Sequence, residues 1–329
     1  MKEITKKILE NKAKTVPILS FPSTQLLGIS VGELISSAEK QVEGMKAIRA
    51  RCDIGASLNM MDLSVEAECF GAEISYTDHE VPTVKHGIID SIYDAADIAV
   101  PSIDSGRCPI YIGGVKKAKE EICDIPVFCG VIGPFSLAAR LFDMTELMME
   151  CYDSPEDVAV LLSKTTEFLS KYVKAFKEAG ADGVIMAEPA AGLLSPALAE
   201  EFSTPYVKQI IDAVADDHFI FCYHNCGNAV LDMADQIATL GADIYHFGNA
   251  ISLKAIIPKM PKDSLVMGNV DPLIFKNGTP DDVKAAVQKV FDECSEFDNF
   301  VLSSGCDIPA SAKWENLDAY FAEVKALYA

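Results

Sequence analysis

The chain has 329 residues, of which 28 are basic and 49 acidic, so its formal net charge is −21. This charge argues against binding to nucleic acid or anionic membranes, which attract basic surfaces, and favours a small-molecule substrate or a protein partner. No apolar run reaches the roughly 18 residues that a membrane span needs, and residues 1–17 are typical of a charged amphipathic helix. We therefore expect a single cytoplasmic domain over residues 1–329, whose ten scattered cysteines are reduced.

Short apolar runs rich in β-branched residues alternate along the chain with longer segments of helical period. Helices are predicted to start at Ser154-Pro155, Ser195-Pro196 and Thr279-Pro280, where an N-cap residue precedes proline. The first of these ends at Ala179-Gly180, and another helix covers Ala312–Leu327. The apolar runs predict strands at Val16–Phe21, Ile54–Leu58, Pro126–Val131, Gly183–Ala187, Phe219–Tyr223, Asp243–Phe247, Leu265–Gly268 and Phe300–Ser303.

The alternation of strands and helices indicates an α/β protein with a parallel sheet. Strands that are apolar throughout are typical of parallel pairing with both faces covered. Six or more such units in about 300 residues favour a (β/α)8 TIM barrel with an N-terminal helical extension over a doubly wound sheet. No GxGxxG or GxxxxGK[ST] motif follows a strand, so the sequence gives no support for dinucleotide or P-loop binding.

Polar residues follow five consecutive predicted strands, at the end where a parallel barrel gathers its chemistry. Such residues can bind a metal ion or polarise a substrate. We would not expect them after five strands in a row if the loops had only to be soluble. The sequence therefore predicts a functional site at this end of the barrel. In chain order the residues are Glu188-Pro189, His224-Asn225-Cys226-Gly227, His246 with Gly248-Asn249, Asn269-Val270-Asp271-Pro272, and Ser304-Gly305-Cys306-Asp307.

Three of these residues suggest a metal centre. His224 and Cys226 lie two residues apart, so on an extended backbone both side chains point to the same side. Cys306 has the equivalent position after the last predicted strand, which barrel closure brings towards the same space. One imidazole and two thiolates form a Cys2His set, which is found in catalytic zinc sites with an open fourth position. We expect these residues to bind Zn²⁺, with Glu188 as a displaceable fourth ligand.

Other interpretations of the same residues remain open. A histidine such as His224 can be a hydrogen-bonded core residue, and Cys306 can be a small buried side chain. His246 lies inside an apolar run, so it is either buried and paired or it orients a metal ligand. We expect the remaining histidines, His79, His86 and His218, to be solvated.

Further segments of the chain match a known family. They are Met61-Asp62, Glu68-Cys69-Phe70-Gly71, Gly133-Pro134-Phe135-Ser136-Leu137-Ala138, Glu188 to Pro196, Gly305-Cys306-Asp307-Ile308-Pro309 and Trp314-Glu315-Asn316-Leu317. With His224-Asn225-Cys226-Gly227, they give a chain that resembles the uroporphyrinogen decarboxylase superfamily over nearly its whole length. Within that superfamily it resembles the zinc-dependent, corrinoid-linked methyltransferases, such as the methylcobamide:coenzyme M methyltransferases.

Two departures separate the chain from the decarboxylases of this superfamily. Decarboxylases carry an arginine-rich segment near the N-terminus that holds the substrate's carboxylates, and the corresponding residues 17–24 contain no arginine. Decarboxylases also carry a histidine near the last strand, where this chain has Cys306. Asp62 matches an aspartate of the decarboxylases and remains a candidate catalytic residue. The resemblance thus implies the fold of the decarboxylases with methyltransferase chemistry.

The resemblance implies methyl transfer between a methylated corrinoid and a small molecule. An unperturbed thiol, with a pKa of about 8.5, is mostly protonated at neutral pH, and zinc would promote loss of its proton. The sulfur would then attack the methyl carbon. Glu188 would be the fourth ligand or a proton acceptor, and Asn249, Asn269 and Asp307 would orient the ligands or the acceptor.

The resemblance also implies a partner, because a corrinoid is too large for the barrel loops to enclose. We expect it to arrive on a corrinoid carrier protein that docks on loops Tyr76–Thr83 and Asp104–Gly114. The direction of transfer stays open, as does the small molecule (thiol, folate or methylated donor) and the choice between monomer and homodimer. Outside this class, the alternatives are a metal-free carboxy-lyase and a barrel with a structural zinc.

Overall fold

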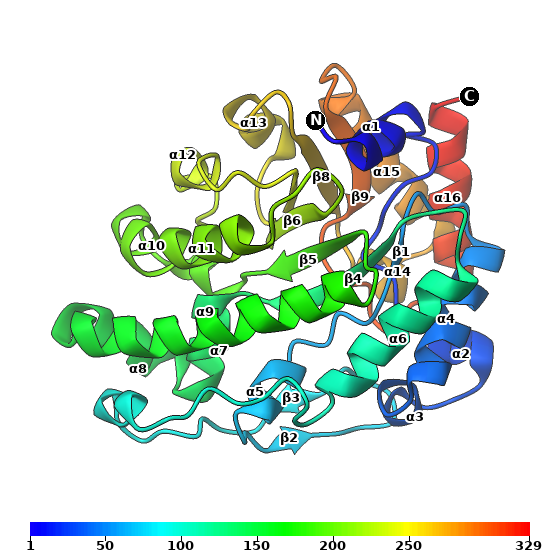
Figure 1. Ribbon diagram of the computed structural model, residues 1–329. Coiled ribbons are helices and arrows are strands. Elements are labelled where there is room, and N and C mark those ends of the chain that lie inside the picture. The colour runs from blue at the N-terminus through cyan, green and yellow to red at the C-terminus, as the bar shows by residue number, and fades with distance from the viewer.

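The computed structural model describes residues 1–329 and is built around a curled, parallel, seven-stranded sheet (Figure 1). The strands follow one another in space in chain order, and every neighbouring pair is parallel. This confirms the α/β class with a parallel sheet. The strands are β1 (Ser57–Leu58), β4 (Val127–Ile132), β5 (Gly183–Ala187), β6 (Ile220–Asn225), β7 (Ile244–Phe247), β8 (Leu265–Val270) and β9 (Phe300–Ser304). Two short strands, β2 (Ile74–Ser75) and β3 (Thr83–Val84), form a separate antiparallel pair.

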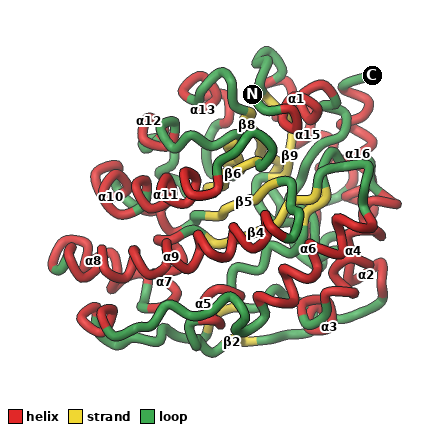
Figure 2. Tube along the Cα trace, in the orientation of Figure 1, coloured by secondary structure: helices red, strands yellow, loops and turns green.

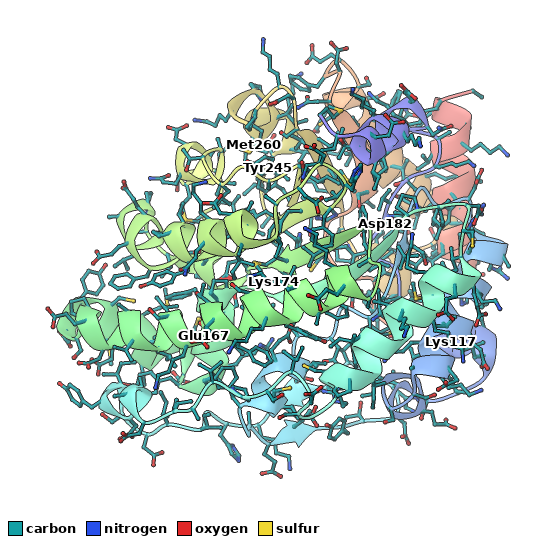
Figure 3. All side chains as sticks on the ribbon, in the orientation of Figure 1. Lys117, Glu167, Lys174, Asp182, Tyr245 and Met260 are labelled. Atoms are coloured by element: carbon teal, nitrogen blue, oxygen red, sulfur yellow. The ribbon has the colours of Figure 1, made fainter.

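Helices surround the sheet, with the strands at the centre of the molecule (Figure 2). Charged side chains such as Glu167 and Lys174 lie on the exposed side of helix α9 (Figure 3). None of the helices has both the length and the apolar character needed to cross a membrane. The helices are α1 (Glu3–Glu10), α2 (Ser23–Leu27), α3 (Val31–Ile35), α4 (Ala38–Arg51), α5 (Val65–Cys69), α6 (Cys108–Glu121), α7 (Pro134–Leu141), α8 (Met144–Asp153), α9 (Pro155–Glu178), α10 (Pro196–Phe202), α11 (Thr204–Val214), α12 (Ala234–Ile237), α13 (Leu253–Ile256), α14 (Ile274–Asn277), α15 (Pro280–Cys294) and α16 (Trp314–Leu327), with short 3₁₀ segments η1 (Ile92–Ala96), η2 (Ala190–Leu193) and η3 (Ile257–Lys259).

The helix boundaries follow the predicted capping signals. Helix α15 begins with a capping box, in which the Thr279 side chain accepts from the Asp282 amide and the Asp282 carboxylate accepts from the Thr279 amide. Helix α9 begins at Pro155 and ends just before Gly180, whose φ of 99° only glycine adopts readily. Ser195 likewise accepts a hydrogen bond from Leu198 at the start of α10. These predicted helices are confirmed.

The sheet has two apolar sides, and side-chain alternation along each strand assigns residues to one or the other. In β6, Ile220 and Cys222 belong to a small inner cluster enclosed by the curled sheet, whereas Phe221 and Tyr223 pack outwards against the helices. Ile8 of α1 also belongs to the inner cluster. Lys2, at the start of α1, forms an ion pair with Asp243 just before β7 (2.9 Å), so α1 lies at the N-terminal end of the strands.

The predicted strand at Val16–Phe21 is wrong, because this segment is extended but forms no regular ladder. Pro17 has no amide hydrogen to donate. Two side chains of β9 hold the segment: Ser303 Oγ donates to Val16 O (2.8 Å), and Ile18 N donates to Ser304 Oγ (3.0 Å). On its other side, the amide of Gly55 donates to Thr15 O (2.9 Å). The segment thus lies between β9 and the residues before β1, where the predicted eighth strand would stand. The strand predicted at Ile54–Leu58 is also shorter than expected, only Ser57–Leu58.

Candidate metal centre

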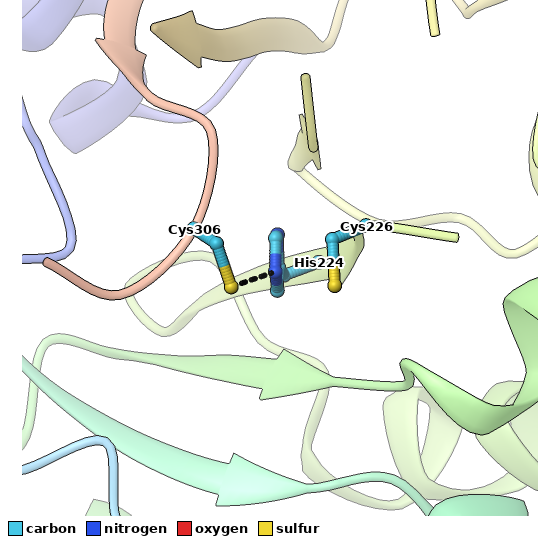
Figure 4. Close-up of side chains that lie close together, drawn as sticks. All are labelled: His224, Cys226 and Cys306. Atoms are coloured by element: carbon cyan, nitrogen blue, oxygen red, sulfur yellow. Dashed lines mark hydrogen bonds between the residues drawn. The ribbon is translucent and has the colours of Figure 1, made fainter. Parts of the chain in front are cut away.

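The structure brings together the three metal ligands predicted from the sequence. The ligand atoms of His224, Cys226 and Cys306 all lie within 4.8 Å of one another. Cys306 Sγ is 3.5 Å from His224 Nε2 (Figure 4). His224 is buried, and the two cysteines are half-buried. One nitrogen and two sulfur donors at such separations fit a tetrahedral Zn²⁺ that keeps one position for another ligand.

The alternation of β6 accounts for the position of His224. The inner residues Ile220 and Cys222 are followed by His224 at the same spacing, so its ring points into the space enclosed by the sheet. The strand reaches Asn225, two residues further than the sequence predicted, so His224 belongs to the strand itself and not to the loop after it. Cys226 is the first residue beyond the strand and continues the same series.

The loop after β7 positions Cys226. A Cβ atom on Gly248 would lie 2.6 Å from the Cβ of Cys226, so only glycine allows this approach. Asn269 holds the loop in place, because its Nδ2 donates to Gly248 O and to Ile251 O, both at 3.0 Å. Asn269, a candidate for orienting the ligands, therefore contacts the loop that packs on Cys226.

A hydrogen-bonded relay fixes the tautomer of His224. Ser303 Oγ donates its hydrogen to Val16 O and so accepts from His246 Nε2 (3.0 Å). His246 Nδ1 is then an acceptor, and His224 Nδ1, 2.8 Å away, is the donor. The carbonyl oxygen of His246, 3.2 Å from the same nitrogen, also requires His224 Nδ1 to carry the hydrogen. His224 Nε2 therefore presents a lone pair towards Cys306.

His246 thus combines the two roles that the sequence left open, because it is fully buried and orients a candidate metal ligand. Burial holds the pKa of His246 well below its ordinary value, so the ring stays neutral, as the relay requires. His224 and His246 are register partners in neighbouring strands. The other histidines, His79, His86 and His218, are exposed as predicted.

The two thiols perturb each other. The neighbouring Cys306 thiol and, to a lesser extent, His224 lower the pKa of Cys226 to about 4. One sulfur of the pair therefore gives up its proton far more easily than an ordinary cysteine, and a thiolate is the form that binds a metal ion.

Glu188 is not among the residues whose ligand atoms converge at the cluster. Its neighbour Ala187 points into the sheet's interior, so Glu188 points the other way, towards α7. Its Oε1 accepts from Ser136 N (2.9 Å), and a Cβ on Gly133 would lie 1.6 Å from its Oε2. Burial raises the pKa of Glu188 to about 8. Because the carboxyl group is fully buried on the outer side of β5, this arrangement does not support it as a zinc ligand or a proton acceptor at the cluster.

The remaining predicted residues have different positions. Asp307 lines the cavity beside the cluster, and its buried Oδ1 has no hydrogen-bond partner. Asn249 is exposed and lies against Gly305, outside that cavity. Asp62 is buried among Ser64, Arg107 and Tyr111 and does not line the cavity either.

The cluster opens into a small cavity of about 240 Å³. From the predicted rim, Val81, Pro82 and Thr83 line it, whereas residues 104–114 form the loop before α6 and its first turns and do not. Arg140 lines it too, although nothing in the sequence of its helix marks this residue out. The other lining residues are Ile18, Met61, Leu63, Ala187, Pro189, His224, Cys226, Cys306 and Asp307.

Comparison with known proteins places the chain in a family. A family model described as uroporphyrinogen decarboxylase (URO-D) matches residues 18–327. The chain is 30% identical over 288 residues to the methylcobamide:CoM methyltransferase MtbA of Methanosarcina mazei, covering 86% of this chain and 80% of the relative. It is 28% identical over 224 residues to the uroporphyrinogen decarboxylase of Parasynechococcus marenigrum, covering 64% of this chain and 61% of that one. A solved structure titled methyltransferase from Methanosarcina mazei superimposes with a TM-score of 0.87 at 23% identity and full coverage of both chains. The chain therefore belongs to the uroporphyrinogen decarboxylase family.

Proposed function

We propose that this member of the uroporphyrinogen decarboxylase family is a zinc-dependent methyltransferase that moves a methyl group from a corrinoid to a small thiol. The observation that carries the proposal is the convergence of His224, Cys226 and Cys306 within 4.8 Å beside a cavity. The similarity to relatives named methylcobamide:CoM methyltransferases supports the corrinoid part of the proposal.

The three side chains would hold the metal with a donor set suited to thiol chemistry. His224 offers the Nε2 lone pair that the relay through His246 keeps free of hydrogen. Cys226 and Cys306 supply two negative charges, which offset the charge of a dication and keep a sulfur nearby electron-rich. A bound zinc ion would lower the pKa of a thiol at its open position.

The transfer itself is a displacement at carbon. The electron pair of the acceptor's sulfur forms the new S–CH₃ bond, and the pair of the Co–CH₃ bond stays with the cobalt, which is reduced. The proton of the thiol leaves before this step. The apolar walls of the cavity, among them Met61, Leu63 and Pro189, exclude water from the sulfur.

The size of the cavity limits which molecules can bind inside it. A space of about 240 Å³ can enclose a thiol of a few carbon atoms but not a folate or a corrinoid ring. The corrinoid would therefore approach from outside on a carrier protein, and the hairpin residues Val81–Thr83 beside the cavity would lie next to it.

The test is methyl transfer from methylcobalamin to a panel of thiols, followed by loss of the Co–CH₃ absorption and by mass of the methylated product. We expect zinc-loaded protein to methylate short thiols and Cys306→Ser to lose the activity. Cys123→Ser is the matched control, because Cys123 is exposed and outside the cluster. Decarboxylation of uroporphyrinogen without methyl transfer would contradict the proposal.

A further inference from the structure

Two cysteines outside the metal centre face each other where two helices meet. Cys69 is the last residue of α5, and Cys108 is the first residue of α6. Their Sγ atoms are 3.2 Å apart, although the residues are separated by 39 positions in the chain. We infer that Cys69 and Cys108 form a redox-active dithiol, which a hydroperoxide oxidises to a disulfide and a small thiol reduces again. This inference does not depend on the proposed function.

The contact between these two sulfur atoms sets the pair apart from the other cysteines outside the metal centre. Cys129 Sγ is hydrogen-bonded only to the carbonyl oxygen of Gly183 (3.5 Å), and the exposed Cys123 only to carbonyl oxygens of α6. The sulfur atoms of a disulfide are about 2.05 Å apart, so Cys69 and Cys108 need to approach each other by only about 1 Å.

The surface loop before α6 gives access to one of the two sulfur atoms. Cys69 is 8% exposed, whereas Cys108 is completely buried. Residues 101–106 of the loop are exposed or half-buried, and Ser105 O accepts a hydrogen bond from Cys69 Sγ (3.2 Å). Gly106 has a φ of 52°, and a Cβ atom there would lie 3.2 Å from Cys69 Sγ, so glycine keeps the space beside this sulfur open. A molecule as small as hydrogen peroxide therefore reaches Cys69 first.

The hydrogen bonds set the order of the chemistry. Because Cys69 donates its hydrogen to Ser105 O, it accepts the hydrogen of Cys108. The contact with Cys69 and burial raise the pKa of Cys108, so Cys108 keeps its proton. That donor would stabilise a thiolate at Cys69, and a thiolate is the form that attacks an oxidant. Cys69 is thus the attacking thiol and Cys108 the resolving thiol.

One peroxide molecule oxidises one pair. The Cys69 thiolate attacks a peroxide oxygen, the O–O bond breaks, and a sulfenic acid forms while the leaving hydroxide takes up the thiol's proton as water. The sulfur of Cys108 then attacks the sulfur of Cys69, the S–O bond breaks, and the leaving hydroxide takes the proton of Cys108 as a second water. The two sulfur atoms are oxidised, and the two peroxide oxygens are reduced. Two molecules of a small thiol reverse the reaction by exchange and leave as their own disulfide.

The pair is connected to the wall of the metal cavity. The residues directly before the two cysteines, Glu68 and Arg107, form an ion pair (2.7 Å). Tyr76 OH donates to Glu68 Oε1 (2.7 Å), and the Arg107 guanidinium lies 5.3 Å from the centre of the Tyr76 ring. Tyr76 follows β2, and the chain continues from there to Val81–Thr83, which line the cavity. Drawing the two sulfur atoms together would therefore shift the contacts that hold this hairpin.

The experiment treats the full-length protein with hydrogen peroxide, in zinc-loaded and in metal-free form, and identifies the products by peptide mass spectrometry. We expect a disulfide between Cys69 and Cys108, which excess 2-mercaptoethanol removes. Cys108→Ser cannot form this bond, so dimedone, which traps sulfenic acid, should label Cys69 at least about tenfold more in this variant than in the wild type. Cys151→Ser is the matched control, because Cys151 is also buried but forms no hydrogen bond with another thiol.

Two results would overturn the inference. One is wild-type protein in which Cys69 accumulates as sulfenic or sulfinic acid without a bond to Cys108. The other is wild-type protein in which the exposed Cys123 is oxidised while Cys69 and Cys108 stay reduced. Neither result requires a variant to fold, and neither bears on methyl transfer.

Hydrogen exchange of residues 74–84 tests the connection to the cavity. We expect the exchange rates of these amides to differ at least about twofold between the oxidised and the reduced wild type. Cys69→Ser protein, which cannot form the disulfide, should show no such change after the same treatment with peroxide. Identical exchange in oxidised and reduced wild type would contradict the connection.

Discussion

Two arginines near the cavity, Arg107 and Arg140, differ in how their charges are compensated. Arg107 donates to Ser64, Glu68 and Tyr111 and pairs with Asp62, so its guanidinium is enclosed by acceptors. Arg140 has no ion pair with an acid and lines the cavity. A buried charge that is fully paired and hydrogen-bonded stabilises the fold, whereas an unpaired charge beside a cavity is available to a ligand.

The largest expected effect concerns Asp62, the acidic partner of Arg107. Asp62→Ala leaves Arg107 buried without its main counter-charge, so the free energy of unfolding should fall by about 3 to 5 kcal/mol. Urea denaturation measures the change. Arg140→Gln should alter the same quantity by less than about 1 kcal/mol, since it breaks no ion pair. If both substitutions cost the same, the distinction between the two arginines would not hold.

A second prediction tests whether Glu66 is a hidden partner of Arg140. Burial raises the pKa of Glu66 from 4.5 to about 7, so the folded protein holds this proton more tightly than the unfolded chain. The cost of ionising the buried Glu66 lowers the free energy of unfolding. This cost is absent below pH 4.5, grows as pH rises to 7 and then stays constant at about 3 kcal/mol. Glu66→Gln should therefore match the wild type at pH 4.5 and be more stable by up to that amount at pH 8, measured by urea denaturation at each pH.

The opposite sign of this pH dependence would reverse the interpretation. If Glu66 were ionised and paired with Arg140, its removal would cost stability at neutral pH, and the cost would disappear on acidification. Such a result would show that Glu66 compensates the charge of Arg140.

The smallest expected effect concerns the relay behind His224. His246→Phe keeps an aromatic side chain but removes the acceptor for His224 Nδ1, so zinc affinity should fall about 10- to 100-fold. His246→Asn offers an amide oxygen near the same position and should recover part of the loss. Competition with a chromogenic chelator measures both. Unchanged affinity in His246→Phe would show that His224 needs no second residue to orient it.

The sequence predicted the parts of the site that depend on local pattern. Strand alternation and the two-residue spacing place His224 and Cys226 on one side, and the parallel sheet brings Cys306 to them. The contact between His224 and His246 could also be predicted, because His246 lies in the next predicted strand, level with His224. What the sequence could not show is that Ser303 bridges His246 to the segment at Val16, which forms no regular strand.

The failures concern side-chain direction and long-range contacts. Glu188 follows a strand end, as the ligands do, yet alternation sends it to the outer face, where Gly133 leaves room for its carboxylate. The hydrogen bond that its Oε1 accepts from Ser136 N in α7 shows the same direction. Arg140 was missed for a related reason, since its importance comes from the absence of a partner, and partners of buried charges are set by tertiary contacts.

The central claim is that His224, Cys226 and Cys306 form a zinc site, and metal analysis of the purified protein tests it most directly. We predict one zinc per chain in the wild type and in Cys123→Ser, and loss of the metal in Cys226→Ser and in Cys306→Ser, with all four proteins folded by circular dichroism. A folded wild type that binds no zinc after dialysis against the metal, or Cys306→Ser protein that retains a full equivalent, would contradict the account.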